Sequence, residues 1–420
     1  MIWRIYAHVP YLQERSQPHH DMIKWIGRLI RKFLFIGRFS VVLPASAPVV
    51  LFHEGGRDIL DQTVLRETDY TLFEPGLKRC PIALTVIVPA VVACFQLIFQ
   101  EISRGPGNRL TIRRCLSYGY TLACMRLMRP TVVITFVHNS SVYWWLSRNL
   151  DGVHFIQIAN AIDVPRNVTT DPVGPGNPEG LISTPVAYFL GQHDVDLYHE
   201  YGHQIDRMIA VGSVRADCYR ARATPVARDF DICLISQWSF GKGPSWRLWS
   251  EIRLSMDIVA SLLKRYVAER RLRLCVVLRS NDAAEIRYVK ELFGPACEAF
   301  PRVDLFDSYR LIDRSDVVVS FSSSIAYEAY SWGKKVLTCN PLKLTAYRIP
   351  IAPECSADTE DYAEFRTKLD ELRGLDQVRY QSRTEASQRY LVEYNPDRPS
   401  FEVIRAELHA ALATCAMVDK

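Results

Sequence analysis

Short apolar runs alternate with longer amphipathic stretches along most of the chain. In each run, β-branched and other apolar side chains occupy consecutive positions rather than alternate ones. This pattern indicates parallel strands that are buried on both faces, and the stretches between them indicate helices. Strands are predicted at Val49–Phe52, Thr131–Val137, Val153–Ile158, Phe230–Ile235, Leu272–Leu278 and Asp316–Phe321. The succession predicts an α/β protein with two Rossmann-like domains that face a cleft.

The periodicity lapses between Asp217 and Arg228, and we place the domain boundary there. The predicted units are an N-terminal Rossmann-like domain at residues 1–220, a second at residues 221–400, and a C-terminal helix or tail at residues 401–420. A chain of 420 residues is long enough to bury a full core in each of two domains.

The stretch from Asp316 to Pro341 has the most specific local pattern. A β-branched strand ends in three serines, Ser322, Ser323 and Ser324, and a helix of about two turns is predicted to follow. A helix N-terminus presents unpaired N–H groups and a partial positive charge, which favour a phosphate. Glu328, one turn into this helix, could accept hydrogen bonds from ribose hydroxyls. The alternative is a serine-capped helix that binds nothing.

Other predicted strands also end in polar residues, where open α/β sheets bind their ligands. In the second domain, Arg279 could pair with a diphosphate or with a carboxylate on a sugar, unless it is an ordinary surface arginine. Asp194 belongs to the densest titratable cluster, where an acid, base or nucleophile could lie, although its alternative role is to cap the next helix. The full set of strand-end residues is Ser236, Gln237 and Arg279 in the second domain, and His53, Glu54, His138, Asn139, Gln157, Asn160, His193 and Asp194 in the first.

Composition narrows the functional classes. The net charge of +5 is mild and the basic residues are scattered, which does not suggest nucleic-acid binding. The 11 cysteines include no CxxC pair, so we interpret them as buried free thiols of a reducing compartment. The N-terminus lacks the pattern of a signal peptide, so a cytoplasmic protein is expected.

Two stretches raise the question of membrane contact. Cys80–Phe99 is almost wholly apolar and nearly long enough to span a bilayer, but two prolines and a glutamine interrupt it. A buried helix, or one on the membrane surface, fits this stretch better than a spanning one. Asp21–Phe39 alternates basic and apolar residues and is predicted to be a basic amphipathic helix. Peripheral contact with an inner membrane is therefore an open expectation.

Five short motifs, in this order, resemble those of bacterial surface-carbohydrate biosynthesis proteins, which make lipopolysaccharide O-antigen or capsule. They are Val132–Asn139, Phe155–Asn160, the Gly191, Asp194 and Tyr198 pattern after Phe189, Val211–Ser213, and Ser322–Glu328. Two Rossmann-like halves with a late strand–serine turn–helix–glutamate unit are also similar to glycosyltransferases of the GT-B fold. The chain departs from the family pattern at His138, where Asp is usual, and at Gln157–Asn160, where Gln-Asn-Gly is usual.

The resemblance implies a glycosyltransferase that moves a sugar from a CMP- or UDP-linked donor to a lipid-linked or oligosaccharide acceptor, with no metal or other cofactor. The nucleotide would bind the second domain at Ser236, Gln237, Arg279, Ser322–Ser324 and Glu328, and the acceptor the first at His53, His138, Asn139, Gln157 and Asn160. A related group, the retaining β-Kdo transferases, uses CMP-Kdo and a carboxylate nucleophile. Resemblance to that group would make Asp194 the nucleophile, with His193 or Glu54 assisting. The alternatives are a nucleotide-sugar 2-epimerase, a CDP-polyol phosphotransferase and a non-catalytic scaffold of polysaccharide assembly.

Overall fold

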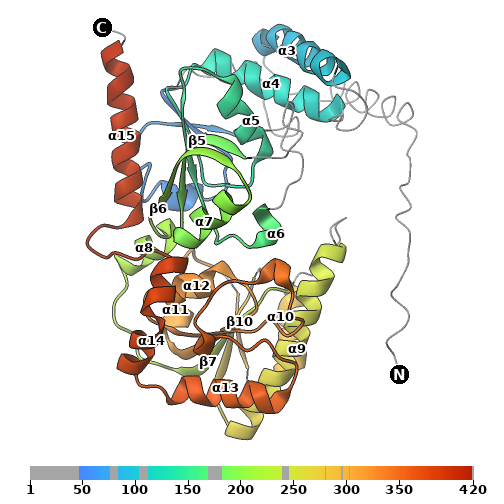
Figure 1. The fold of residues 1–420 in the computed structure, drawn as a ribbon, viewed down its shortest axis with the longest axis vertical. Coiled ribbons are helices and arrows are strands. Elements are labelled where there is room, and N and C mark those ends of the chain that lie inside the picture. The colour runs from blue at the N-terminus through green and yellow to red at the C-terminus, as the bar shows by residue number, and fades with distance from the viewer. Residues whose placement is uncertain are drawn as a thin grey trace.

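The computed structural model describes residues 47–75, 84–103, 112–168, 182–238, 246–279, 281–294, 297–301 and 303–418. The basic helix predicted at Asp21–Phe39 and the first four residues of the apolar stretch 80–99 lie outside this part of the chain. Two parallel sheets form the core, one in each half of the molecule (Figure 1).

The first sheet has the strand order β2-β1-β3-β4-β5-β6, and every neighbouring pair is parallel. Its strands are β1 (Val49–Phe52), β2 (Thr71–Phe73), β3 (Val132–Thr135), β4 (His154–Ile158), β5 (Ser183–Phe189) and β6 (Gln204–Ala210). The helices of this half are α2 (Arg57–Leu60), α3 (Leu84–Ser103), α4 (Ile112–Met128), α5 (Ser141–Asn149), α6 (Pro165–Val168), α7 (Gln192–Glu200) and α8 (Val214–Arg220).

The second sheet has the order β11-β10-β7-β8-β9 and is also parallel throughout. Its strands are β7 (Phe230–Ile235), β8 (Leu274–Val277), β9 (Glu298–Phe300), β10 (Ser315–Ser320) and β11 (Lys335–Thr338). Its helices are α9 (Trp246–Arg270), α10 (Ala283–Phe293), α11 (Asp307–Asp313) and α12 (Ser324–Ser331), followed by the short turns η1 (Thr345–Tyr347) and η2 (Pro353–Cys355) and by α13 (Tyr362–Gly374), α14 (Gln377–Leu391) and α15 (Ser400–Val418).

The central strands are apolar at consecutive positions because both faces of each sheet are covered. In β1, Val50 and Phe52 join one hydrophobic cluster while Val49 and Leu51 join another on the opposite face. All four side chains are fully buried. A strand with one solvated face would alternate apolar and polar residues, so the unbroken runs require helices on both sides. The structure thus confirms the predicted fold class of an α/β protein with two parallel sheets.

The chain returns to the first half after the second sheet. The first sheet ends at Ala210 and the second begins at Phe230, on either side of the predicted boundary. Helix α14 packs against α7, and α15 packs against α8 and β3 along the flank of the first half (Figure 1). The C-terminal helices therefore tie the two halves together.

No helix in the described part of the chain combines the length and the apolar character needed to cross a membrane. Helix α3, which covers most of the apolar stretch, packs against α4 on one side. The side chains of nine cysteines are described by the structure, and all nine are buried and free. This agrees with the prediction of buried free thiols.

Candidate functional site

Strand order determines which loops meet at the edge of the second sheet. The chain passes from β7 through β8 to β9 in one direction, and then returns so that β10 pairs with the other side of β7. The carboxyl ends of β7 and β10 are therefore neighbours at a topological switch point, where open α/β sheets leave a crevice for ligands. The loop after β7 carries Ser236 and Gln237, and the loop after β10 carries Ser322–Ser324.

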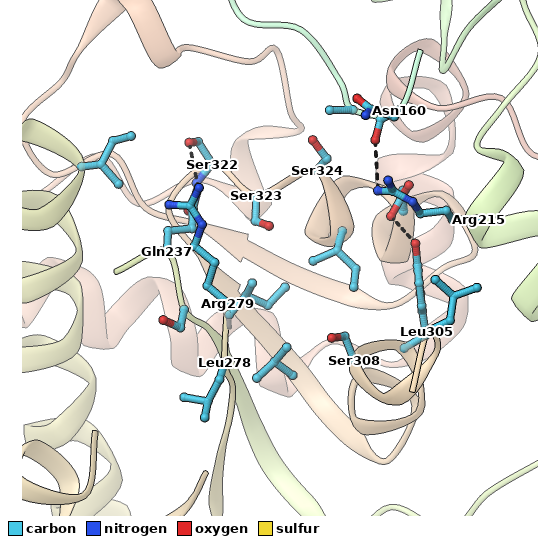
Figure 2. Close-up of a pocket in the computed structure, with 18 residues that line it drawn as sticks. Asn160, Arg215, Gln237, Leu278, Arg279, Leu305, Ser308, Ser322, Ser323 and Ser324 are labelled. Atoms are coloured by element: carbon cyan, nitrogen blue, oxygen red, sulfur yellow. Dashed lines mark hydrogen bonds between the residues drawn. The ribbon is translucent and has the colours of Figure 1, made fainter. Parts of the chain in front are cut away.

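A cavity of about 430 Å³ opens at this switch point. A volume of this size suits a small ligand such as a nucleotide. Figure 2 shows its lining residues converging from both halves of the molecule. The predicted residues that line it are Asn160, Ser236, Gln237, Arg279, Ser322, Ser323, Ser324 and Glu328, and the polar lining residues that were not predicted are Arg215, Ser308 and Tyr309.

The three serines make different contacts. The side chain of Gln237 bridges to Ser322, accepting from its backbone N–H at 2.8 Å and donating to its hydroxyl at 3.4 Å. Ser323 is the N-cap residue of α12, as predicted, but its side chain forms no capping hydrogen bond. The hydroxyl of Ser324 accepts from the backbone N–H of Ile162 in the first half, at 3.2 Å. Hydroxyls and the helix N-terminus thus line one wall of the cavity.

A buried carboxylate positions the opposite strand ends. Glu285, at the start of α10, is fully buried and accepts from the backbone N–H of Arg279 at 2.9 Å. Its same oxygen accepts a hydrogen bond from the hydroxyl of Ser236. Glu285 therefore fixes the loop after β7 and the loop after β8 relative to each other, with the Arg279 side chain along the cavity wall (Figure 2). This residue was missed because it lies inside a helix, away from any strand end.

The first half contributes a second arginine. Arg215, near the start of α8, donates to the backbone carbonyl of Asn160 at 3.3 Å, and its guanidinium lies 5.0 Å from the ring centre of Phe136. Figure 2 shows Arg215 and Arg279 on opposite sides of the row of serines. Two cations with hydroxyl donors between them form an environment suited to an anionic ligand.

Glu328 is committed to contacts within the protein. Its carboxylate accepts from the hydroxyl of Tyr309 at 2.7 Å and from the hydroxyl of Ser213, which belongs to the first half. Burial raises the pKa of Glu328, while nearby Arg215 and the two hydroxyl donors counteract this increase. Glu328 borders the cavity and is buried, and each of its oxygens accepts one hydrogen bond from a protein hydroxyl. A carboxylate oxygen has two lone pairs, so the contact with ribose hydroxyls stays a prediction.

Asp194 and His138 lie in a buried network behind the cavity wall. Asp163 is at its centre: its carboxylate is 3.2 Å from Nε2 of His138 and accepts from the hydroxyl of Tyr198 at 3.1 Å. Its backbone N–H donates to Asp194 at 3.0 Å. Nδ1 of His138 accepts from the backbone N–H of Asn160 at 3.4 Å. The network therefore holds the loop 160–163, whose first two residues line the cavity.

The predicted nucleophile lies beside the cavity rather than in its lining. Asp194 is fully buried and is not one of the lining residues. Burial and the neighbouring Asp163 carboxylate raise its pKa well above the usual range. His193 faces the same network, with Nε2 3.3 Å from the carbonyl oxygen of Asp163, and burial lowers its pKa. Both residues contact the backbone of Asp163 in the loop 160–163, and their catalytic role stays a prediction.

Three other predicted residues lie near the switch point of the first sheet, between β1 and β3. Nε2 of His53 is 2.8 Å from the hydroxyl of Ser140, and this contact joins the ends of the two strands. His53 has a φ of 77°, a strained value for a residue other than glycine. Glu54 and Asn139 are exposed beside it. None of the three lines the cavity.

Gln157, predicted as an acceptor contact, lies inside the first half rather than at the cavity. Its side chain is fully buried, and its carbonyl oxygen accepts from the indole N–H of Trp144 at 2.6 Å. The alternation of side chains along β4 directs position 157 into the core and leaves Asn160, beyond the strand end, at the cavity. In the described part of the chain, no three His, Cys, Asp or Glu side chains are grouped so as to hold a metal ion.

Comparisons with known proteins agree with this architecture. Residues 187–346 match a family model described as "putative O-antigen biosynthesis protein". No curated protein sequence matches the chain. Similar solved structures include S. aureus MnaA with UDP, at 14% identity and a TM-score of 0.51 over 87% of this chain and 96% of MnaA.

Two further structures are similar to the same extent. A UDP-N-acetylglucosamine 2-epimerase from Rickettsia bellii is 10% identical, with a TM-score of 0.53 over 88% of this chain and 96% of the epimerase. The wall teichoic acid polymerase TagF, with CDPG, is 10% identical, with a TM-score of 0.50 over 96% of this chain and 99% of that chain. At these identities the likeness shows the fold alone, which is the two-sheet GT-B architecture.

Proposed function

We propose that this protein binds a nucleotide-linked sugar in the cavity between its two sheets and transfers the sugar in the biosynthesis of a bacterial surface glycan such as O-antigen. The observation that carries the proposal is the cavity at the β7–β10 switch point, lined by Ser322–Ser324 and flanked by Arg279 and Arg215. The match of residues 187–346 to the O-antigen family model supports the biological setting.

The chemistry of the cavity suits departure of a phosphate. When the bond between sugar and phosphate breaks, negative charge develops on the phosphate oxygens. Hydroxyls of the serine loop, N–H groups at the start of α12 and the guanidinium of Arg279 are held in place before the reaction, so they stabilise that charge without reorganisation. The donor could be CMP- or UDP-linked, and a donor sugar with a carboxylate, such as Kdo, would suit the second arginine.

The acceptor would approach from the first half. The loop 160–163 and the strained turn at His53 and Glu54 follow the carboxyl ends of β4 and β1 in the first sheet, and Ile162 of this loop contacts Ser324 of the second half. We assign His138, Asp163 and Asp194 to positioning the loop 160–163. His138 contacts the Asp163 carboxylate and accepts from the loop backbone at Asn160, and Asp194 accepts from the loop backbone at Asp163.

2-Epimerisation is the alternative activity for this cavity. Changing the configuration at a sugar carbon requires groups that remove and return a proton. Among the described lining residues, Glu328 is the only carboxylate, and it is engaged by Tyr309 and Ser213. Conversion of a UDP-sugar without any acceptor would favour the epimerase, transfer from CDP-glycerol would favour the polyol phosphotransferase, and a protein that no nucleotide stabilises would be the scaffold.

The decisive experiment is a thermal-shift screen of the full chain against CMP, UDP, GDP and CDP, followed by titration of the best ligand. A ligand at about 100 times its dissociation constant stabilises the folded state by about 2.7 kcal/mol. We expect Arg279→Gln to weaken binding by about tenfold, because one charge-assisted contact to phosphate is lost.

The matched control is Arg273→Gln. Arg273 precedes the same strand, β8, at its opposite end and is exposed. The Arg273→Gln variant should bind the nucleotide as tightly as the wild type does. Absence of any nucleotide binding by the wild type, or equal loss in both variants, would overturn the proposed site.

A further inference from the structure

The outer face of α3 is an exposed apolar stripe. It consists of Val88, Val91, Val92, Phe95 and Phe99, whose spacing of three, four and seven residues places them along one side of the helix. Val88 is 70% exposed, Phe95 68% and Phe99 75%. A contiguous exposed stripe that includes two phenylalanines marks an interaction surface rather than ordinary surface scatter.

Only one side of α3 packs against the described part of the first half. This side, opposite the stripe, contains Ala90, Ala93, Cys94 and Leu97 and is buried. Close approach fixes this packing, since a Cβ added to Gly119 of α4 would lie 2.7 Å from the sulfur of Cys94. Figure 1 shows α3 and α4 at the end of the first half, away from the second sheet. The helix is therefore anchored on one face and exposed on the other.

The sequence around the helix is basic. Residues 76–83 and 104–114 contain Lys and Arg but neither Asp nor Glu, and α3 itself has a single charged residue, Glu101. The six basic residues are Lys78, Arg79, Arg104, Arg109, Arg113 and Arg114. Apolar side chains flanked by Lys and Arg are complementary to an anionic lipid surface, where apolar groups enter the acyl boundary and cations attract the headgroups.

We propose that α3 docks this protein on an anionic membrane surface, lying in the plane of the bilayer with the stripe from Val88 to Phe99 inserted. The stripe is about 16 Å long at 1.5 Å per residue, a length that suits in-plane contact. This inference is independent of the nucleotide site, because no residue of the stripe lines the cavity. It would hold the catalytic cleft close to acceptors carried on lipid.

Sedimentation of the full chain with vesicles tests the proposal. Vesicles of phosphatidylcholine alone are compared with vesicles that also contain phosphatidylglycerol, at low and high NaCl. We expect binding to the anionic vesicles and its reduction by salt, which screens the basic residues. Phe95→Ser together with Phe99→Ser should lower the partition coefficient by at least about tenfold, since two phenylalanines no longer enter the acyl boundary.

The control is Val303→Ser together with Val378→Ser. These valines are 85% and 79% exposed, and both lie in the second half. The control should partition as the wild type does, and both double variants should keep the wild-type thermal midpoint because all four side chains are exposed.

Three results would overturn the inference. The wild type could bind neither kind of vesicle, or both double variants could lose vesicle binding equally. Alternatively, light scattering could show that the wild type is a dimer and the phenylalanine variant a monomer. The last result would assign the stripe to a second copy of the chain. The assay contains no nucleotide, so its failure would leave the nucleotide site untouched.

Discussion

The carboxyl group of Asp217 connects two helices that are far apart in the sequence. One oxygen accepts from the backbone N–H of Ser400, at 2.7 Å. Asp217 lies in α8, so a side chain of α8 caps the start of α15. The other oxygen is buried without a hydrogen-bond partner among the described residues. Burial raises the pKa of Asp217 to about 6, although the hydrogen bonds from Ser400 act in the opposite direction. The group therefore folds more favourably in its protonated form.

The sign of the pH dependence follows from that shift. Between the unfolded pKa of 3.8 and the folded value of about 6, the folded state binds more protons, so stability falls as pH rises through this window. Asp217→Asn cannot ionise. Relative to the wild type, its free energy of unfolding should increase by about 2 kcal/mol between pH 4 and pH 8.

Urea unfolding of both proteins across that pH range measures the difference. The Asn side chain keeps the oxygen that accepts from Ser400, so the cap survives in the variant. A difference between variant and wild type that does not change with pH would show that Asp217 is ionised in both states.

At the scale of elements, the end of α14 crosses the start of α7 so closely that the two backbones are in contact. Gly191 is the N-cap residue of α7, and a Cβ there would lie 2.3 Å from the carbonyl oxygen of Leu391. The backbone N–H of Glu393 donates to Leu190 beside it, at 2.8 Å. The backbone of Gly191 is extended, a conformation that any residue adopts, so the lack of a side chain is what permits the crossing.

Gly191→Ala should therefore destabilise the protein by about 1–3 kcal/mol, as overpacking in a well-packed region does. Gly374→Ala is the matched control, since a Cβ at this end of α13 meets no atom within 4 Å. The control should change stability by less than about 1 kcal/mol. Thermal or urea midpoints measure both variants, and equal midpoints would show that α14 can move aside at little cost.

At the scale of the whole molecule, the cavity depends on contacts between its halves. Ser324 accepts from Ile162, and Ser213 donates to Glu328, so the serine loop and α12 are joined to the first half on both sides. Arg215 extends into the cavity from the first half, while Arg279 extends from the second. A ligand bound between the two arginines would be contacted by both halves at once.

This division predicts a split in affinity. Arg215→Gln should change the dissociation constant of the free nucleotide by no more than about twofold. It should raise the dissociation constant of the corresponding nucleotide-sugar by about tenfold, because the first half contacts the transferred group. Calorimetric titration with both ligands measures the split. Arg222→Gln is the control, since Arg222 pairs with Gln62 on the first half, away from the cavity. Equal weakening of both ligands by Arg215→Gln would place that arginine at the phosphate.

The sequence by itself determined six strands, which became β1, β3, β4, β7, β8 and β10, and the serine turn of the β10–α12 unit. These features depend on local periodicity and on the few residue types that are compatible with turns, so residues close together in the sequence are enough to define them. Gly333, which follows α12, has the positive φ that such a helix end requires. The apolar runs also indicated two-sided burial, and hence parallel sheets covered by helices.

Only the tertiary structure decided which polar strand ends share a cavity. Strand order places β10 beside β7, and the turn of α8 directs Arg215 into the same space. Asp194 and His193 were predicted as catalytic residues, and α7 directs both into a buried network around Asp163. Such outcomes depend on contacts between residues far apart in the chain, and no local pattern records the direction in which a side chain points once those segments have packed.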